Sequence, residues 1–149
     1  MKSFRKSLVI GAFLFSLLPL GATAEEGAAG QRPGVTIAAR ANDPQLIDLA
    51  VATRIADRQP EEAGDSFPAS VGQLYCWAAV KNSGEPTEVT IIWRFGDSVV
   101  TEKSVSIGTS SRWRSWTRQR INEKNTGSWS CEVVDQNKES LGKATFTVQ

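Results

Sequence analysis

Residues 88–107 read EVTIIWRFGDSVVTEKSVSI, and they carry the clearest structural signal in the chain. In the first half of this stretch, alternate positions hold four large apolar residues: Val89, Ile91, Trp93 and Phe95. A period of two with β-branched and aromatic residues is typical of a half-buried β-strand. Gly96 and Asp97 then join residues 88–95 to residues 98–107 as a tight hairpin turn. The stretch therefore predicts two adjacent antiparallel strands.

The same pattern recurs on both sides of this hairpin. Seven short segments, separated by polar or glycine-containing turns, are predicted to be strands: 49–55, 74–80, 88–95, 98–107, 112–121, 128–135 and 141–148. About seven short strands with frequent turns favour an all-β fold, a single antiparallel β-sandwich of the immunoglobulin or fibronectin kind. A closed barrel is the competing all-β solution. Residues 56–71 form the least regular connection and are a candidate to wrap one edge of the sandwich.

Two cysteines, Cys76 and Cys131, each lie in the middle of a predicted strand on a face shared with apolar residues. Two inward-facing thiols suit a disulfide bridge between the two sheets, and two buried free thiols are the alternative. A redox-active or metal-binding pair would favour C-x-x-C spacing or further ligands, and the sequence has neither. Trp77, Trp93 and Trp129 are assigned to the core, because large aromatic residues on strands usually bury.

The N-terminus predicts export. Lys2, Arg5 and Lys6 precede an uncharged apolar run of 13 residues, and an A-x-A site ends at Ala24. This pattern is typical of a secretory signal peptide over residues 1–24. An uncleaved anchor is the alternative, although a spanning helix needs about 20 apolar residues. Cleavage would leave an exported chain, periplasmic or secreted, with no transmembrane segment.

Two further segments follow the signal peptide. Residues 25–45 are predicted to be a flexible leader, because they are rich in Gly, Ala and Glu and show no periodicity. Within this leader, Asp43 and Pro44 could begin a short helix or approach the first strand in an extended form. Residues 46–149 are predicted to be the β-sandwich domain.

Some of these residues resemble known families. Cys76, Trp93 and the run Gly127-x-Trp129-x-Cys131 are similar to the immunoglobulin arrangement of Cys, Trp and Cys, with Trp129 where that pattern has Tyr. A closer resemblance, over residues 49–148, is to an uncharacterised bacterial domain found in small exported or membrane-attached proteins. Its signature is matched by residues 67–76, 112–116, 127–129 and 141–148. That domain of unknown function implies an all-β fold, and it implies no activity and no site residue.

The chemistry of the chain argues against an enzyme. With no histidine in the sequence, Ser-His-Asp and Cys-His nucleophiles and the usual imidazole base are excluded. There is no phosphate-binding glycine-rich motif and no calcium loop, so no cofactor and no metal site is predicted. A pair of carboxylates could support glycoside hydrolysis, which remains a remote alternative, but the sequence nominates no pair. A non-catalytic binding or accessory module is the preferred interpretation.

One segment stands out as a candidate binding surface. On a strand over residues 112–120, one face would carry Arg112, Arg114, Trp116, Arg118 and Arg120, and the opposite face Trp113, Ser115, Thr117 and Gln119. Guanidinium groups cannot be buried together without carboxylate partners, so the first face should meet water or a ligand. An exposed tryptophan stacks on a sugar ring or planar group, and arginines bind carboxylate or phosphate in a bidentate manner.

Two interpretations of that face remain open. It could be a solvated face whose arginines pair with Glu102, Glu123 or Glu132 across strands. It could instead bind an anionic cell-envelope ligand, either polysaccharide or peptidoglycan. The alternative function is a protein–protein or assembly contact with an envelope protein, through an exposed sheet edge or apolar patch. Nucleic acid is not an expected partner, since removing three of the 17 basic residues with the signal peptide leaves 14 against 16 acidic ones.

Overall fold

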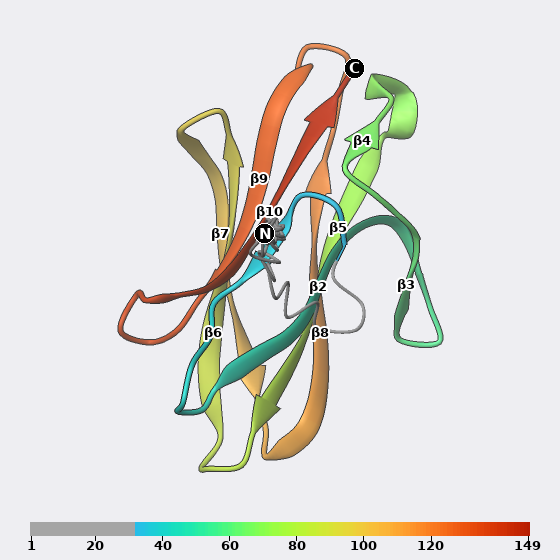
Figure 1. Cartoon of the computed structure of the whole chain (residues 1–149). Helices are drawn as coiled ribbons and strands as arrows, with labels where there is room; N and C mark the ends of the chain where they lie inside the picture. Colours follow the sequence, from blue (N-terminus) through green and yellow to red (C-terminus); the bar gives the residue numbers. More distant parts are fainter. Residues whose placement is uncertain (1–31) are drawn as a thin grey trace, which may run out of the picture.

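The computed structural model describes residues 32–149 as two stacked β-sheets (Figure 1). The predicted signal peptide and the first part of the predicted leader lie outside the described residues. Ten strands and one short 3-10 helix follow each other along the chain: β1 (Val35–Ile37), β2 (Gln45–Ala56), β3 (Gln59–Ala63), β4 (Ser66–Phe67), η1 (Ala69–Val71), β5 (Gln73–Asn82), β6 (Thr87–Phe95), β7 (Ser98–Ile107), β8 (Ser110–Arg120), β9 (Gly127–Val134) and β10 (Ser140–Val148).

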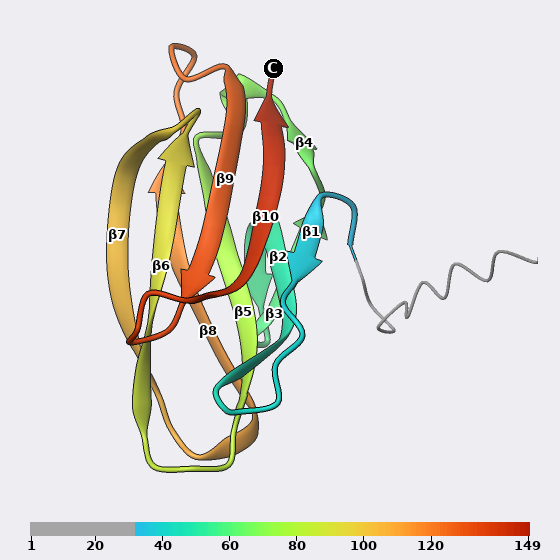
Figure 2. The ribbon, with the colours of Figure 1, turned by 60° about the vertical axis from the view of Figure 1, so that its left-hand side comes forward.

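The strands form one larger and one smaller sheet. The larger sheet has the order β1-β10-β9-β6-β7, and β4 also pairs with β10; the smaller sheet has the order β3-β2-β5-β8. All neighbours are antiparallel except β4 and β10, which form a short parallel pair. The larger sheet has β1 and β7 at its edges and the smaller sheet β3 and β8, so β7 and β8 lie in different layers although they are consecutive in the chain (Figure 2). The antiparallel sandwich of the immunoglobulin kind is thus confirmed, and the closed barrel is wrong.

All seven predicted strands are present, with ends that differ by a few residues. The first starts earlier than expected, at Gln45, and residues 41–44 form a bend that leads into it, so the short helix is wrong. The irregular stretch 56–71 contains β3, β4 and η1, and it does lie along the sandwich edge, because β3 pairs with β2 and β4 with β10. The polar composition of QPEEA in β3 hides its strand character, since an edge strand needs no apolar alternation.

Strand β1 corrects the predicted leader. Val35 is buried, and Val35–Ile37 pair with residues 142–144 of β10. Ala38 N–H also donates to Leu141 C=O at 2.9 Å. Three residues are too few to show a period, so the sequence pattern could not reveal a strand there. The folded domain therefore begins ahead of residue 46.

The core between the sheets is aromatic and is crossed by a disulfide. Cys76 on β5 and Cys131 on β9 are fully buried and bonded, with their Cα atoms 6.5 Å apart, so the predicted inter-sheet bridge is confirmed. Trp93 pairs with Cys131 across strands β6 and β9. The Trp93 indole N–H donates to the Thr117 hydroxyl at 2.9 Å, and its ring meets Phe146 edge-on at 6.1 Å. The hydrogen bond joins β6 of the larger sheet to β8 of the smaller one, whereas the aromatic contact packs two strands of the larger sheet against each other.

Replacing both cysteines by alanine (C76A with C131A) is expected to lower the free energy of unfolding by about 4 kcal/mol, because the bridge closes a loop of 55 residues in the unfolded chain. Urea unfolding followed by tryptophan fluorescence measures this change. The unchanged protein under strong reducing conditions is the matched control and should lose a similar amount. Unfolding midpoints that coincide with and without the bridge would contradict a structural role for it.

Asp135 organises the turn between β9 and β10. Its carboxylate accepts hydrogen bonds from the N–H groups of Asn137 and Glu139 and from the Arg40 guanidinium, at 2.8, 2.9 and 2.9 Å. Burial by itself would raise the pKa of Asp135, but these hydrogen bonds and the Arg40 charge outweigh it and lower the pKa below its ordinary value of 3.8. The ionised carboxylate thereby links Arg40, which precedes β2, to the turn between β9 and β10.

A lowered pKa in the folded state stabilises the fold above the ordinary pKa, and the stabilisation is lost as pH falls through the folded value. Asp135→Asn is expected to lower the free energy of unfolding by about 1–3 kcal/mol at pH 7, since it removes the charge of the group that accepts these three hydrogen bonds. The difference in the free energy of unfolding between this variant and the unchanged protein should become smaller below pH 3.8. Unfolding curves recorded from pH 7 to pH 2 give the measurement, with exposed Asp97→Asn as the control. A difference in the free energy of unfolding that stays constant from pH 7 to pH 2 would refute the coupling between stability and the ionisation of Asp135.

Candidate functional site

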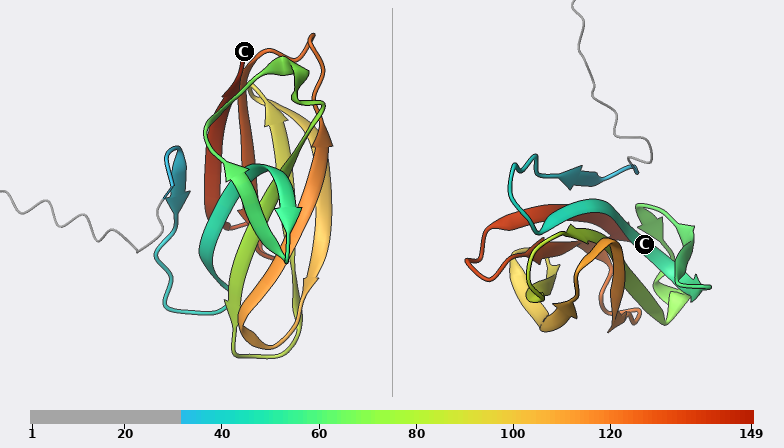
Figure 3. Two further views of the ribbon diagram at one scale, coloured as in Figure 1. Left: turned by 90° about the vertical axis from the view of Figure 1, so that its right-hand side faces the viewer. Right: turned by 90° about the horizontal axis from the view of Figure 1, so that it is seen from below.

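The outer face of the smaller sheet carries the candidate site. Strands β3, β2, β5 and β8 lie toward the viewer in the left view of Figure 3. On β8, alternate side chains point outward and form what we call the basic row: Arg112, Arg114, Trp116, Arg118 and Arg120. Across β5, Trp116 lies opposite Trp77, and Arg118 lies opposite Tyr75. The predicted face therefore exists as one row along an edge strand.

The other side of β8 faces the core, as predicted. Thr117 is buried and accepts the hydrogen bond from Trp93, and Trp113 packs against the core residues. Gln119 accepts a hydrogen bond from the Thr101 hydroxyl of β7 at 2.7 Å. Since this side is anchored in the sandwich, the arginines cannot rotate inward. The outward direction of the row is a consequence of strand alternation.

Exposure within the basic row is uneven. Arg112, Arg118 and Arg120 are exposed, Arg114 is half-buried, and Trp116 is 37% exposed. Trp77, its neighbour on β5, is buried, although it lies on the outer face of the sheet rather than between the sheets. Of the two adjacent indoles, only Trp116 is therefore available to a ligand.

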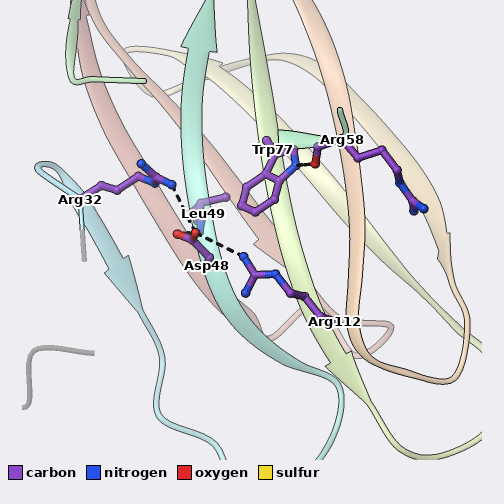
Figure 4. A network of polar contacts seen from close by, with 6 residues as sticks. All are labelled: Arg32, Asp48, Leu49, Arg58, Trp77 and Arg112. Carbon is purple, nitrogen blue, oxygen red and sulfur yellow. Dashed lines mark hydrogen bonds and ion pairs between the residues drawn. The ribbon is translucent and has the colours of Figure 1, made fainter. Parts of the chain in front are cut away.

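Trp77 is covered by its surroundings, which Figure 4 shows at close range. Its indole N–H donates to the backbone carbonyl of Arg58 at 3.0 Å, and the Arg112 guanidinium lies 5.8 Å from its ring centre. Arg58 belongs to the turn between β2 and β3, so the hairpin closes over the ring. The sequence placed Trp77 in the core, and the structure places it in a separate outer cluster with Ala50 and Ala79.

Asp48 of β2 is the carboxylate that pairs with the basic row. Its carboxylate lies 3.3 Å from a guanidinium nitrogen of Arg32 and 3.9 Å from one of Arg112. Neither Arg32 nor Asp48 was predicted from the sequence, because their meeting depends on the packing of the chain ahead of β1 against β2. The alternation of β2 gave no signal for Asp48, because the register of this strand shifts between Leu46 and Asp48.

In the described part of the chain, the remaining arginines of the row have no carboxylate partner. Among the ion pairs of residues 32–149, Arg112 is the only member of the row that takes part. The predicted cross-strand pairing with Glu102, Glu123 or Glu132 is wrong, and Glu132 instead binds Arg94 at 2.8 Å. The Nε atom of Arg114 is buried without a hydrogen-bond partner. The row thus presents an excess of positive charge with unused donors.

A hollow of about 360 Å³ lies elsewhere, on the outer side of the larger sheet. Hydroxyl-bearing residues and two opposite charges line much of it: Asp65, Ser128, Ser130, Lys143, Thr145 and Thr147. No residue of the basic row lines this hollow. Over residues 32–149, no cluster of three or more His, Cys, Asp or Glu side chains could hold a metal ion. In the same residues, no helix has the length and apolar character needed to cross a membrane.

These features define an immunoglobulin-like β-sandwich domain with a one-sided basic and aromatic surface. Residues 86–148 match the sequence model of a family described as "Protein of unknown function (DUF2914)", which confirms the resemblance to a domain of unknown function over those residues. The matched part spans β6 to β10, including Trp93, the basic row and Cys131, whereas residues 67–76 lie outside it.

Two further comparisons complete this picture. No curated protein matches the chain. The chain is similar to the CARDB domain of a Pyrococcus furiosus protein, whose structure was solved in complex with di-metal ions; the TM-score is 0.38 and the identity 15%, over 56% of this chain and 84% of that one. The assignment of the fold rests on the sheets of this chain themselves.

Arg112→Ala is expected to lower the free energy of unfolding by about 1 kcal/mol, because it removes the guanidinium over the Trp77 ring and one partner of Asp48. Arg118→Ala is the matched control on the same strand and face, and it should change stability by less than about 0.5 kcal/mol. Urea unfolding of both variants gives the comparison. Equal effects of the two substitutions would show that Arg112 does not cover Trp77 in solution.

Proposed function

We propose that this protein is a non-catalytic, exported binding module that holds an anionic cell-envelope ligand against its basic row. The observation that carries the proposal is the unpaired charge of that row. Arg114, Arg118 and Arg120 have no carboxylate partner among the described residues. Arginine is weakly hydrated and forms bidentate hydrogen bonds, so such a row favours carboxylate, sulfate or phosphate groups.

The geometry suits a ligand that combines rings with negative charges. Arg114 and Arg118 flank Trp116 two positions away on either side, about 7 Å each along an extended strand. A sugar ring on the exposed indole would place its substituents between two guanidinium groups. Anionic polysaccharide and peptidoglycan both offer rings and carboxylates. Either therefore fits the row as a first candidate.

Two observations support a role without catalysis. The chain has no histidine, which excludes the usual imidazole base and nucleophile arrangements. Glycoside hydrolysis needs two carboxyl groups flanking one bond. On the candidate face, Asp48 is held between Arg32 and Arg112, so it is not free to act as one of such a pair.

The proposed location is outside the cytoplasm. Residues 1–24 have the pattern of a signal peptide, and disulfides such as Cys76–Cys131 persist in oxidising compartments. An envelope ligand would be within reach there.

A second candidate role is contact with an envelope protein through an open sheet edge, which the free edge of β8 supports.

Arg114→Ala combined with Arg118→Ala is expected to weaken binding to an anionic polysaccharide at least about tenfold, because two charged hydrogen bonds are lost. Binding of the unchanged protein should also fall as salt is raised. Isothermal titration with alginate, and co-sedimentation with purified peptidoglycan, would measure both effects.

The matched control is Lys138→Ala combined with Lys143→Ala, which removes the same charge from exposed positions outside the basic row. This control should bind as the unchanged protein does. Binding that is insensitive to salt, or that falls equally in both double variants, would refute a role for the row.

A further inference from the structure

Strand β8 has an open edge as well as a basic face. It is eleven residues long, and it lies at the end of the smaller sheet, where β5 is its only ladder partner within residues 32–149. Its chain neighbour β7 belongs to the other sheet. An edge strand of this length offers a row of main-chain donors and acceptors for another strand. Long open edges are usually shortened, covered or charged, and here the charges are all of one sign.

One hydrogen bond shows which residues of β8 face that edge. Ile121 N–H donates to Gly72 C=O at 3.0 Å, and this pair continues the register in which Gln73 lies opposite Arg120. In an antiparallel ladder, hydrogen-bonded and non-hydrogen-bonded pairs alternate. The main-chain groups of Ser115, Thr117 and Gln119 therefore point toward β5, and those of the even-numbered residues point toward the open edge.

The residues that face the open edge are also those of the basic row. Arg114, Trp116 and Arg118 direct their main-chain groups sideways into the edge and their side chains onto the outer face. A strand added there would form hydrogen-bonded pairs with these three residues. The partner side chains directly opposite would lie on the same face, close to the guanidinium groups and the indole.

A second copy of this chain is a poor occupant of the edge. Antiparallel pairing of β8 with β8 about Trp116 would place Arg114 opposite Arg118 and Arg112 opposite Arg120. Like charges directly opposite each other destabilise a strand pair. An acidic strand has the complementary charge, because each carboxylate opposite an arginine can form a charged, bidentate contact.

We infer that the open edge of β8 receives an extended acidic segment of a partner protein by strand addition, with carboxylates opposite Arg114 and Arg118 and an apolar residue opposite Trp116. This goes beyond the proposed function, since it assigns the main-chain edge of β8 in addition to its outward side chains. The expected motif is acid-x-apolar-x-acid. Main-chain hydrogen bonds supply affinity in this mode, and the alternate side chains supply specificity.

A blocked seven-residue peptide with glutamate at positions two and six, valine at position four and threonine elsewhere tests the inference. Fluorescence anisotropy on the purified, disulfide-bonded protein should show saturable binding. N-methylation at positions two, four and six removes the three N–H groups that would face β8 and should weaken binding at least about tenfold. N-methylation at positions three and five, which would face away, should leave the affinity within about threefold.

Equal effects of the two N-methylation patterns would overturn strand addition, because charge attraction alone does not distinguish them. Absence of any peptide binding would also overturn it, and would mean that the arginines only keep the edge from pairing. Neither result bears on alginate or peptidoglycan binding, which does not use the main-chain edge. The proposed function can therefore stand when this inference fails, and the reverse holds as well.

A pair of variants tests the same edge from the side of the protein. Trp116→Val keeps the N–H group, and Trp116→Pro removes it without breaking the ladder to β5, because this N–H points to the open edge. Peptide binding should survive the valine variant and be lost in the proline variant, whereas both lose the indole for sugar stacking. Equal peptide affinity in the two variants would overturn the inference. Circular dichroism checks the fold, and the N-methylated peptides decide the question if the proline variant unfolds.

Discussion

The bridge between Cys76 and Cys131 is the constraint on which the other features depend. It joins the second strand from the edge of the smaller sheet to a central strand of the larger one, and Trp93 fills the space beside it. Because β5 is held in this way, its ladder with β8 has a fixed register. The outward direction of every arginine in the basic row follows from that register.

Strand β8 serves the core and the surface at once. Its inward side chains include Thr117, which satisfies the buried indole of Trp93, and Trp113, which packs on the core. With that side anchored, its outward side carries an excess of charge that the rest of the sheet does not neutralise. Burying those guanidinium groups would be costly without partners, so the sandwich leaves this strand at its edge. The edge position of β8 therefore agrees with the charge on its outward side.

The outer face of the smaller sheet is divided into a covered half and an open half. The hairpin of β2 and β3 closes over Trp77, with Arg112 above the ring and Asp48 held between Arg112 and Arg32. Beyond Arg112, the row has neither a covering loop nor an ionic partner among the described residues. This asymmetry separates the arginine that stabilises the fold from those that remain available for binding.

Strand positions, the inward and outward faces of β8 and the pairing of the cysteines were accessible from the sequence, because side-chain alternation is a local property of each strand. The order of the strands, the open edge and the partners of each charge were not, because they depend on contacts between segments far apart in the chain. Glu132 therefore binds Arg94 rather than the basic row. Val35 pairs with β10 of the larger sheet, although the residues around it in the sequence show no strand pattern. On β8, the sequence alone determined which residues turn outward, because alternation is local; the tertiary structure decided which of them meet a partner, and that Trp77 lies on the outer face rather than between the sheets.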